Sequence, residues 1–254
     1  MFESYLYYPD KIPSDVPPPA WTPPGAREVF IEDEDSVRIH GLWWDEPAGR
    51  PVILFLHGNA QEVYSWSLVR EDLSALGCRM LLIDYRGYGK SGGEPREAGL
   101  YMDGRAALAW LEGQGVGAKD TVVFGKSLGG AVACEIARGR ELLGLVLEST
   151  FTSLASVARS LFPILPGYSP GPDVYDSLSK LPEITCPVLV IHGDEDLLIP
   201  VAEGRRLFED AHEPKQLYIV PGAGHNDVSI MAGPQYGEVI NKWLEKAESR
   251  KGNG

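Results

Sequence analysis

Short apolar runs alternate along the chain with longer stretches in which apolar residues recur at helical spacing. The short runs predict strands at residues 37–44, 52–56, 80–83, 121–124, 145–147, 188–191 and 217–220. The run at 52–56 is apolar throughout, which is typical of a strand covered on both faces. Helices are predicted between the strands at about 63–76, 97–110, 128–136 and 201–210, and around 236–248 near the end of the chain.

This alternation indicates an α/β protein, in which helices cover both faces of a mostly parallel sheet. We predict one such domain over residues 26–254, with a sheet of about eight strands. Residues 151–187 interrupt the alternation with a helix and a loop rich in Pro and Ser. We expect this insert to form a small cap rather than a second domain.

A proline-rich arm precedes the first strand. The stretch 11–25 holds six prolines, which exclude a helix or a central strand: Pro13, Pro17, Pro18, Pro19, Pro23 and Pro24. We therefore predict an extended arm over residues 1–25. A surface arm packed on the domain is favoured over a proline-rich ligand for a partner, with four aromatic residues as its contacts: Tyr5, Tyr7, Tyr8 and Trp21.

Composition and charge narrow the class of protein. The 254 residues are 44% apolar and 23% charged, an ordinary globular composition that needs no disulfide or metal to hold a core. Cys78, Cys134 and Cys186 are too widely spaced for a disulfide framework or a CxxC site, and we expect buried thiols. A formal net charge of -13 disfavours binding to nucleic acid or to anionic lipid.

The segment from Met1 to Tyr8 has an early acid, no basic region and no long apolar core, so no signal peptide is expected. Nowhere does the chain approach the roughly 20 apolar residues that span a bilayer, and we expect no stable membrane insertion. A cytoplasmic location follows as an expectation, and the oligomeric state is left open.

The motif most specific for chemistry is Gly125-Lys126-Ser127-Leu128-Gly129-Gly130, between the strand at 121–124 and the helix at 128–136. A nucleophile elbow requires this context, because its serine occupies a tight strand-to-helix turn in which the glycines make room. The alternative is a glycine-rich turn capped by a serine. We predict that Ser127 is a nucleophile.

A serine nucleophile needs a histidine base, and the chain has five histidines: His40, His57, His192, His212 and His225. His225 lies in the loop after the last predicted strand, at the sheet edge where ligands bind in open α/β folds. His57 and His192 lie at strand ends before glycines, where a structural hydrogen bond is the commoner role. We therefore predict His225 as the base.

An acid that orients the base is expected after the preceding strand, where His192-Gly193-Asp194-Glu195-Asp196 supplies three carboxylates. Spacing leaves Asp194 and Asp196 open. An oxyanion hole needs two backbone N–H groups. The residue after the nucleophile, Leu128, provides one, and Asn59 is predicted to provide the other from the loop after Leu56.

Taken together, these motifs resemble the α/β-hydrolase superfamily over nearly all of the chain after the arm. Five blocks occur in the family's order: His57-Gly58-Asn59, Asp84-Tyr85-Arg86-Gly87-Tyr88-Gly89-Lys90-Ser91, Gly125 to Gly130, His192 to Asp196, and Gly224-His225. The chain is most similar to the serine-aminopeptidase and monoacylglycerol-lipase-like branch, and in particular to its palmitoyl-thioesterase-like relatives. These relatives commonly carry a basic residue before the nucleophile, as Lys126 does here.

The resemblance implies an α/β-hydrolase fold and selects Asp196 as the acid. It also implies that Asp84 and Arg86 hold the loop after their strand and take no part in catalysis. Many such relatives have a hydrophobic or Cys-rich leader, and proline-specific peptidases of the family have a longer cap. This sequence shows no such leader, and its insert is shorter than that of the proline-specific peptidases. Both differences disfavour a peptidase or a membrane depalmitoylase.

The sequence therefore predicts hydrolysis of a small-molecule carboxylic ester or thioester, and no metal or cofactor motif is present. The same triad could instead serve an aminopeptidase or amidase, with a carboxylate for the substrate amine: Asp173, Asp176 or Glu148. The chain could also be a non-catalytic binding module on the same fold, or a partner-binding protein that acts through the arm. The apolar face of the insert fits an acyl group above the site and a contribution to the core equally well.

Overall fold

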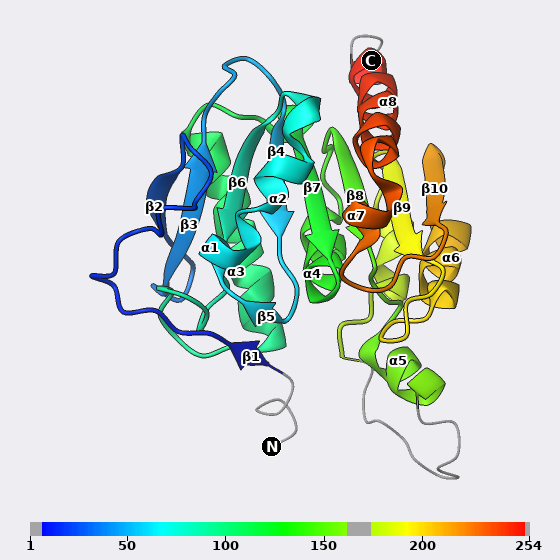
Figure 1. Ribbon diagram of the computed structural model, residues 1–254, viewed down its shortest axis with the longest axis horizontal. Helices are drawn as coiled ribbons and strands as arrows, with labels where there is room; N and C mark the ends of the chain where they lie inside the picture. Colours follow the sequence, from blue (N-terminus) through cyan, green and yellow to red (C-terminus); the bar gives the residue numbers. More distant parts are fainter. Residues whose placement is uncertain (1–6, 162–173, 252–254) are drawn as a thin grey trace.

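A twisted sheet forms the centre of the molecule in the computed structural model, which describes residues 7–161 and 174–251 (Figure 1). Within these residues, eight strands lie side by side in the order β10-β9-β8-β7-β4-β6-β3-β2. Their bounds are β2 Arg27–Glu32, β3 Arg38–Trp44, β4 Val52–Leu56, β6 Arg79–Ile83, β7 Thr121–Lys126, β8 Gly144–Glu148, β9 Val188–Gly193 and β10 Lys215–Val220. In this order, the six strands from β10 through β4 to β6 are parallel. Strand β3 pairs antiparallel with β6, and β2 pairs antiparallel with β3 at the edge. The predicted mostly parallel α/β sheet is confirmed.

Helices cover both faces of this sheet. The α-helices are α1 Val63–Trp66, α2 Val69–Asp72, α3 Glu97–Gly113, α4 Leu128–Ala137, α5 Leu154–Leu161, α6 Val201–Asp210, α7 Val228–Ala232 and α8 Pro234–Lys251. Three 3-10 turns accompany them: η2 Ser74–Leu76, η3 Ala118–Asp120 and η4 Leu178–Glu183. In Figure 1, α1, α2, α7 and α8 lie in front of the sheet, whereas α3, α4 and α6 lie behind it.

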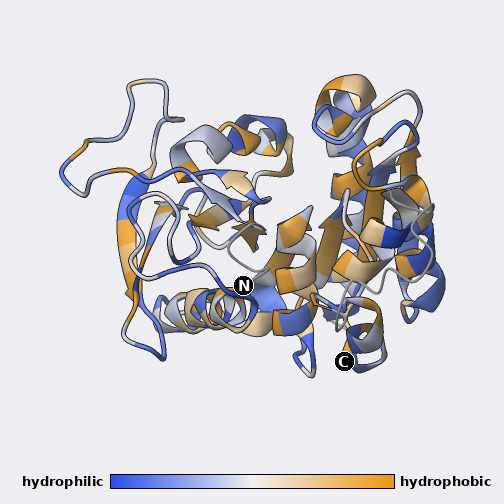
Figure 2. Ribbon diagram, turned by 90° about the horizontal axis from the view of Figure 1, so that it is seen from below, coloured by the Kyte–Doolittle hydropathy of each residue, from blue (hydrophilic) through white to orange (hydrophobic). Residues whose placement is uncertain are grey.

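Two apolar layers hold the helices to the sheet. One layer joins the strands to α3, α4 and α6, through residues such as Leu100, Val132 and Leu207. The other joins them to α1, α2 and α8, through residues such as Tyr64 and Trp243. Seen from below, the strand ribbons are mainly hydrophobic, while the helices alternate hydrophobic and hydrophilic patches (Figure 2). Burial on both faces explains why the central strands, β4 and β6 to β9, are mostly apolar.

The continuous helix predicted over residues 63–76 is wrong. The structure has α1, α2 and η2 there, three short turns in succession. The Ser67 hydroxyl donates to the Tyr64 carbonyl at 2.6 Å, and the Ser67 N–H also bonds that carbonyl. Serine competes with the helical backbone in this way, because its side chain reaches local carbonyls. Apolar spacing thus identified the buried positions but missed the breaks.

Strand β2 and helix α7 are among the elements that were not predicted. Strand β2 lies at the edge of the sheet, and its side chains are mostly exposed or half-buried. It pairs with β3 over six residue pairs, from Arg27 opposite Trp43 to Glu32 opposite Arg38. Helix α7 has only five residues, too few to show a helical period.

The described part of the arm lies along the domain as an extended segment. Strand β1 (Tyr8–Pro9) pairs parallel with β5 (Ala60–Gln61), and Tyr7 is buried with its hydroxyl 2.7 Å from that of Tyr175. The predicted packing of Tyr8 and Trp21 is wrong, because these side chains are 67% and 51% exposed. Tyr5 lies outside the described residues.

The insert at 151–187 contributes α5 and η4 among the described residues, whereas 162–173 lie outside them. Glu203 of α6 binds the first residues of the insert. Its carboxylate accepts from the Thr152 N–H at 2.9 Å and from the Ser156 hydroxyl at 2.6 Å. Whether the insert works as a cap stays a prediction. No helix among the described residues is long and apolar enough to cross a membrane.

Candidate active site

Ser127 occupies the turn between β7 and α4. Its φ of 54° and ψ of -120° lie where residues with a Cβ are rarely found. The neighbouring glycines permit this turn. A Cβ on Gly125 would lie 2.3 Å from the Gly129 carbonyl oxygen, and one on Gly129 would lie 2.0 Å from that of Leu56. The strained turn and the glycine requirement are the features expected of a nucleophile elbow.

The strain at Ser127 leads to a stability prediction. Replacing Ser127 with glycine should relieve about 1–3 kcal/mol of backbone strain, offset by about 0.5–1 kcal/mol of added chain entropy. We expect a net gain of about 1 kcal/mol in the free energy of unfolding, measured by urea denaturation. Ser127→Ala keeps a Cβ and serves as the control. A glycine variant no more stable than the alanine variant would contradict the strain argument.

His225 lies in the loop after β10 and contacts both other predicted members of the triad. Its Nε2 is 3.1 Å from the Ser127 hydroxyl oxygen, and its Nδ1 is 2.7 Å from Asp196 Oδ2. Because the carboxylate oxygen only accepts, Nδ1 donates, which leaves Nε2 to accept from the serine. The structure therefore places serine, histidine and acid in one hydrogen-bonded series.

Asp196 is buried beneath His225 in the loop after β9. Its Oδ1 accepts from the backbone N–H groups of Leu198 and Ile199, at 2.9 and 2.8 Å. Burial alone would raise the pKa of Asp196, but the hydrogen bonds from His192 and His225 outweigh it and hold this pKa below its usual range. The carboxyl is thus ionised at neutral pH.

The two carboxylates that spacing left open point in different directions. Asp194 Oδ1 accepts from the Gly222 N–H at 2.6 Å, whereas Asp196 faces His225.

Sequence reasoning missed a further contact of Asp196. The buried His192 ring, expected only as a structural group, donates to the Ile199 carbonyl at 2.8 Å and lies 3.4 Å from Asp196 Oδ2.

The two predicted oxyanion donors come from two segments that lie beside Ser127. Leu128 is the first residue of α4, so its N–H has no acceptor within the helix. Asn59 follows β4 and lines the same cleft as Ser127 and His225. The loop between β4 and Asn59 lies against the nucleophile, since a Cβ on Gly58 would be 3.5 Å from the Ser127 Cβ.

A cleft of about 750 Å³ opens above Ser127. Its apolar lining includes residues of the arm, of α1–α2 and of the β9 loop: Tyr8, Trp66, Leu68, Val69 and Leu198. A buried polar group lines it beside the nucleophile. Lys126 Nζ is 2.7 Å from Glu148 Oε1, and the Tyr236 hydroxyl donates to Glu148 Oε2 at 2.5 Å. Adjacent strand ends, β7 and β8, bring Lys126 and Glu148 together, a pairing that the sequence order alone does not reveal.

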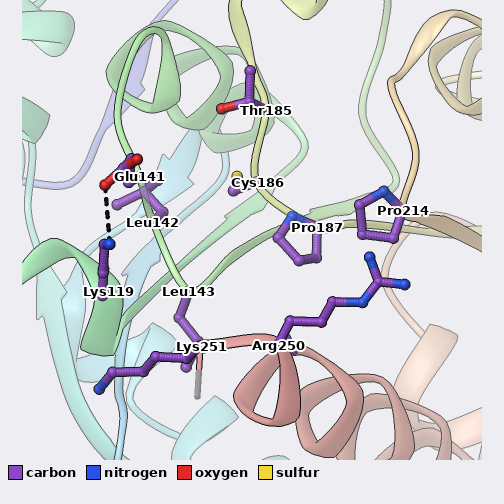
Figure 3. Close-up of a pocket in the computed structure, with 11 residues that line it drawn as sticks. Lys119, Glu141, Leu142, Leu143, Thr185, Cys186, Pro187, Pro214, Arg250 and Lys251 are labelled. Carbon is purple, nitrogen blue, oxygen red and sulfur yellow. Dashed lines mark ion pairs between the residues drawn. The ribbon is translucent and has the colours of Figure 1, made fainter. Parts of the chain in front are cut away.

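A second pocket, of about 300 Å³, lies at the opposite edge of the sheet, where strands begin (Figure 3). Lys119 pairs with Glu141 at 3.2 Å there, and Cys186 is its only thiol among the described residues. Burial raises the pKa of Cys186 to about 12, so this thiol is a poor nucleophile. The pocket thus lacks an activated nucleophile. No cluster of three potential metal ligands is found in the described part of the chain.

Asp84 and Arg86 take part in buried contacts behind the site. Asp84 accepts from the Val63 N–H at 2.8 Å, and Arg86 donates to Asp103 at 3.0 Å and to Asp35 at 3.1 Å. Neither lines the cleft. Their positions agree with the structural role that the resemblance implied. The three cysteines are unpaired and buried, as predicted.

Comparison with known proteins places these features in context. A family model described as alpha/beta hydrolase fold matches residues 51–173. An uncharacterised protein of Mycobacterium tuberculosis is 38% identical, over 94% of this chain and 85% of its own. Alpha/beta hydrolase domain-containing protein 17B of Homo sapiens is 35% identical, over 79% and 68%. Protein bem46 of Schizosaccharomyces pombe is 30% identical, over 96% and 86%.

Solved structures share the architecture. The Pyrococcus furiosus esterase Pf2001 superposes with a TM-score of 0.76 at 22% identity, and the match covers 95% of this chain and 98% of that one. The esterase domain of a Rhodothermus marinus protein gives a TM-score of 0.67 at 20% identity, over 87% and 98%. At these identities the likeness concerns the fold.

Proposed function

Since the chain belongs to the α/β-hydrolase family, we propose that it is a serine hydrolase that cleaves a carboxylic ester or thioester. The observation that carries this proposal is the hydrogen-bonded series of Ser127, His225 and Asp196 at the wall of an open cleft. Esterases among the proteins of similar fold agree with it.

The contacts suggest the order of events. Ser127 Oγ attacks the substrate carbonyl while His225 Nε2 takes its proton, and Asp196 stabilises the imidazolium that forms. The N–H groups of Asn59 and Leu128 bind the oxyanion. His225 then gives this proton to the leaving-group oxygen or sulfur, which departs as an alcohol or thiol. Water, deprotonated by the same histidine, attacks the acyl-serine, and His225 returns the proton to Ser127 Oγ as the acid leaves.

A fluorophosphonate probe tests the proposal directly, because it labels only activated serines. We expect the wild type to be labelled at Ser127 and Ser127→Ala to remain unlabelled. Turnover of p-nitrophenyl esters of increasing acyl length, and of matched thioesters, would then define the preferred substrate. If the folded wild type is not labelled, a non-catalytic binding module becomes the better interpretation.

An aminopeptidase or amidase on the same residues is less well supported. A free amine would need an available carboxylate, but both oxygens of Glu148 are occupied, by Lys126 and by Tyr236. Asp176 accepts from the Ser179 N–H at 3.0 Å, and Asp173 lies outside the described residues. Faster turnover of an aminoacyl amide than of the matched ester would reverse this preference.

The cytoplasmic location remains a proposal. Three unpaired thiols fit a reducing compartment, and the net charge of -13 still disfavours nucleic-acid partners. Fractionation of cells that produce the protein tests the location, since recovery in the membrane or secreted fraction would contradict it.

A further inference from the structure

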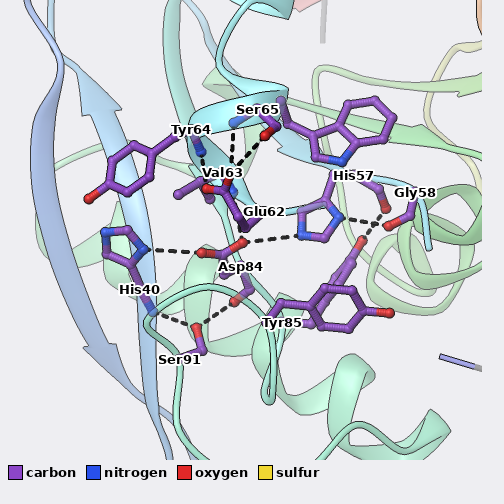
Figure 4. Close-up of polar contacts among 12 residues, drawn as sticks. His40, His57, Gly58, Glu62, Val63, Tyr64, Ser65, Asp84, Tyr85 and Ser91 are labelled. Atoms are coloured by element: carbon purple, nitrogen blue, oxygen red, sulfur yellow. Dashed lines mark hydrogen bonds and ion pairs between the residues drawn. The ribbon is translucent and has the colours of Figure 1, made fainter. Parts of the chain in front are cut away.

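The ring of His57 lies fully buried behind the oxyanion loop, which we define as residues 57–60 (Figure 4). Its Nδ1 is 2.7 Å from the carbonyl oxygen of the next residue, Gly58. A carbonyl oxygen only accepts hydrogen bonds, so Nδ1 carries the proton and donates. The histidine therefore holds the Gly58 carbonyl against the interior of the protein.

This contact fixes the direction of the next N–H group. The peptide bond between Gly58 and Asn59 is trans, because the cis bonds of the described chain lie at Pro47 and Pro214. In a planar trans peptide the C=O and N–H bonds point in opposite directions. Since the Gly58 carbonyl points at the buried ring, the Asn59 N–H points the other way, toward the side on which Asn59 and Ser127 line the cleft.

Three groups surround the ring. Its Nε2 makes no hydrogen bond among the described residues and lies 3.6 Å from Asp84 Oδ1. The centroid of the ring lies 4.6 Å from that of the tilted Tyr85 ring and 5.9 Å from that of the Trp66 ring, which stacks on it. The Tyr85 hydroxyl also donates to the His57 carbonyl at 2.9 Å. A ring packed in this way cannot turn without displacing its neighbours.

Asp84 links the ring to the rest of the fold. It is fully buried, accepts from the Val63 N–H at 2.8 Å and lies 3.1 Å from His40 Nδ1. The far nitrogen of His40 is 2.9 Å from Glu28. Burial favours the neutral carboxyl, yet the two histidines hold the pKa of Asp84 below its usual value. An ionised Asp84 thus faces His57.

We propose that His57 is a positioning residue: by binding the Gly58 carbonyl, it aims the Asn59 N–H at the oxyanion of the reaction proposed above. The proposal rests on that function, but it concerns a residue that touches no reacting atom. It gives a function to the buried polar ring that directly follows β4. Loss of the contact should weaken binding of the transition state and leave binding of the substrate unchanged, because the oxyanion is absent from the bound substrate.

Two variants separate the two nitrogens of the ring. Asparagine carries its amide N–H near the position of Nδ1, whereas glutamine carries one near the position of Nε2. We expect His57→Gln to lower kcat for a p-nitrophenyl ester about 10²-fold with KM unchanged, and His57→Asn to stay within about threefold of wild type. A trifluoromethyl ketone, whose serine adduct carries an oxyanion, should bind His57→Gln weaker by the same factor as kcat falls.

Equal losses in the two variants, or a rise in KM with kcat unchanged, would overturn the proposal. Long-range ¹H–¹⁵N NMR of the wild type gives a test that needs no variant. We expect a protonated, exchange-protected Nδ1 at His57, and a bare Nδ1 would also overturn the proposal. This spectrum is independent of turnover, so failure of fluorophosphonate labelling, which would refute the proposed function, is distinguishable from failure of the His57 assignment.

Discussion

Replacing Ser127 with alanine should lower kcat for the best ester substrate by about six orders of magnitude. The variant loses the atom that forms the acyl-enzyme, and the His225 proton acceptor, 3.1 Å away, then has no nucleophile to activate. The fold should be retained, since alanine tolerates the turn as serine does. Steady-state hydrolysis of p-nitrophenyl esters, with the melting temperature measured on the same preparation, checks both expectations.

A matched control lies in the same cleft. Ser65 also lines it, but its hydroxyl donates to Glu62 at 2.7 Å and is not part of the triad. We expect Ser65→Ala to keep kcat within about threefold of wild type, as surface polar changes usually do. Turnover by Ser127→Ala above a few hundredths of wild type would mean that another group is the nucleophile.

Much of this site could be predicted because its residues lie in local motifs. Glycines around Ser127 and the position of His225 after the last strand are properties of short segments, and parallel strand order brings their ends to one edge. Local spacing could not choose between Asp194 and Asp196. The resemblance selected Asp196. In the structure Asp196 faces His225, whereas Asp194 turns toward the Gly222 backbone.

Contacts between distant segments were not predictable. The meeting of His57, Asp84 and His40 depends on the lateral order of three strands, which the sequence does not state. The exposure of side chains in the arm could not be predicted either, because Tyr7 is buried while its neighbour Tyr8 is exposed. Such choices are made by packing between elements, and hydrophobicity along the chain gives no information about them.

The second large effect is expected from Asp196→Asn, which should lower kcat about 10⁴-fold with little change in KM. The backbone N–H groups of Leu198 and Ile199 both donate to Oδ1, so the amide oxygen of the new side chain must take that position. Its NH₂ group then faces His225 Nδ1. A donor there forces the imidazole proton onto Nε2, and the histidine can no longer accept the proton of Ser127.

Asp194→Asn is the matched control, because it makes the same change in the same loop two residues earlier. Its carboxylate bonds only the Gly222 N–H among the described residues, and an amide oxygen can accept that bond equally well. We expect kcat within about twofold of wild type and an unchanged pH profile. Equal losses in the two variants would mean that the acid acts through the charge of the loop, whereas a loss confined to Asp196→Asn assigns the effect to the tautomer of His225.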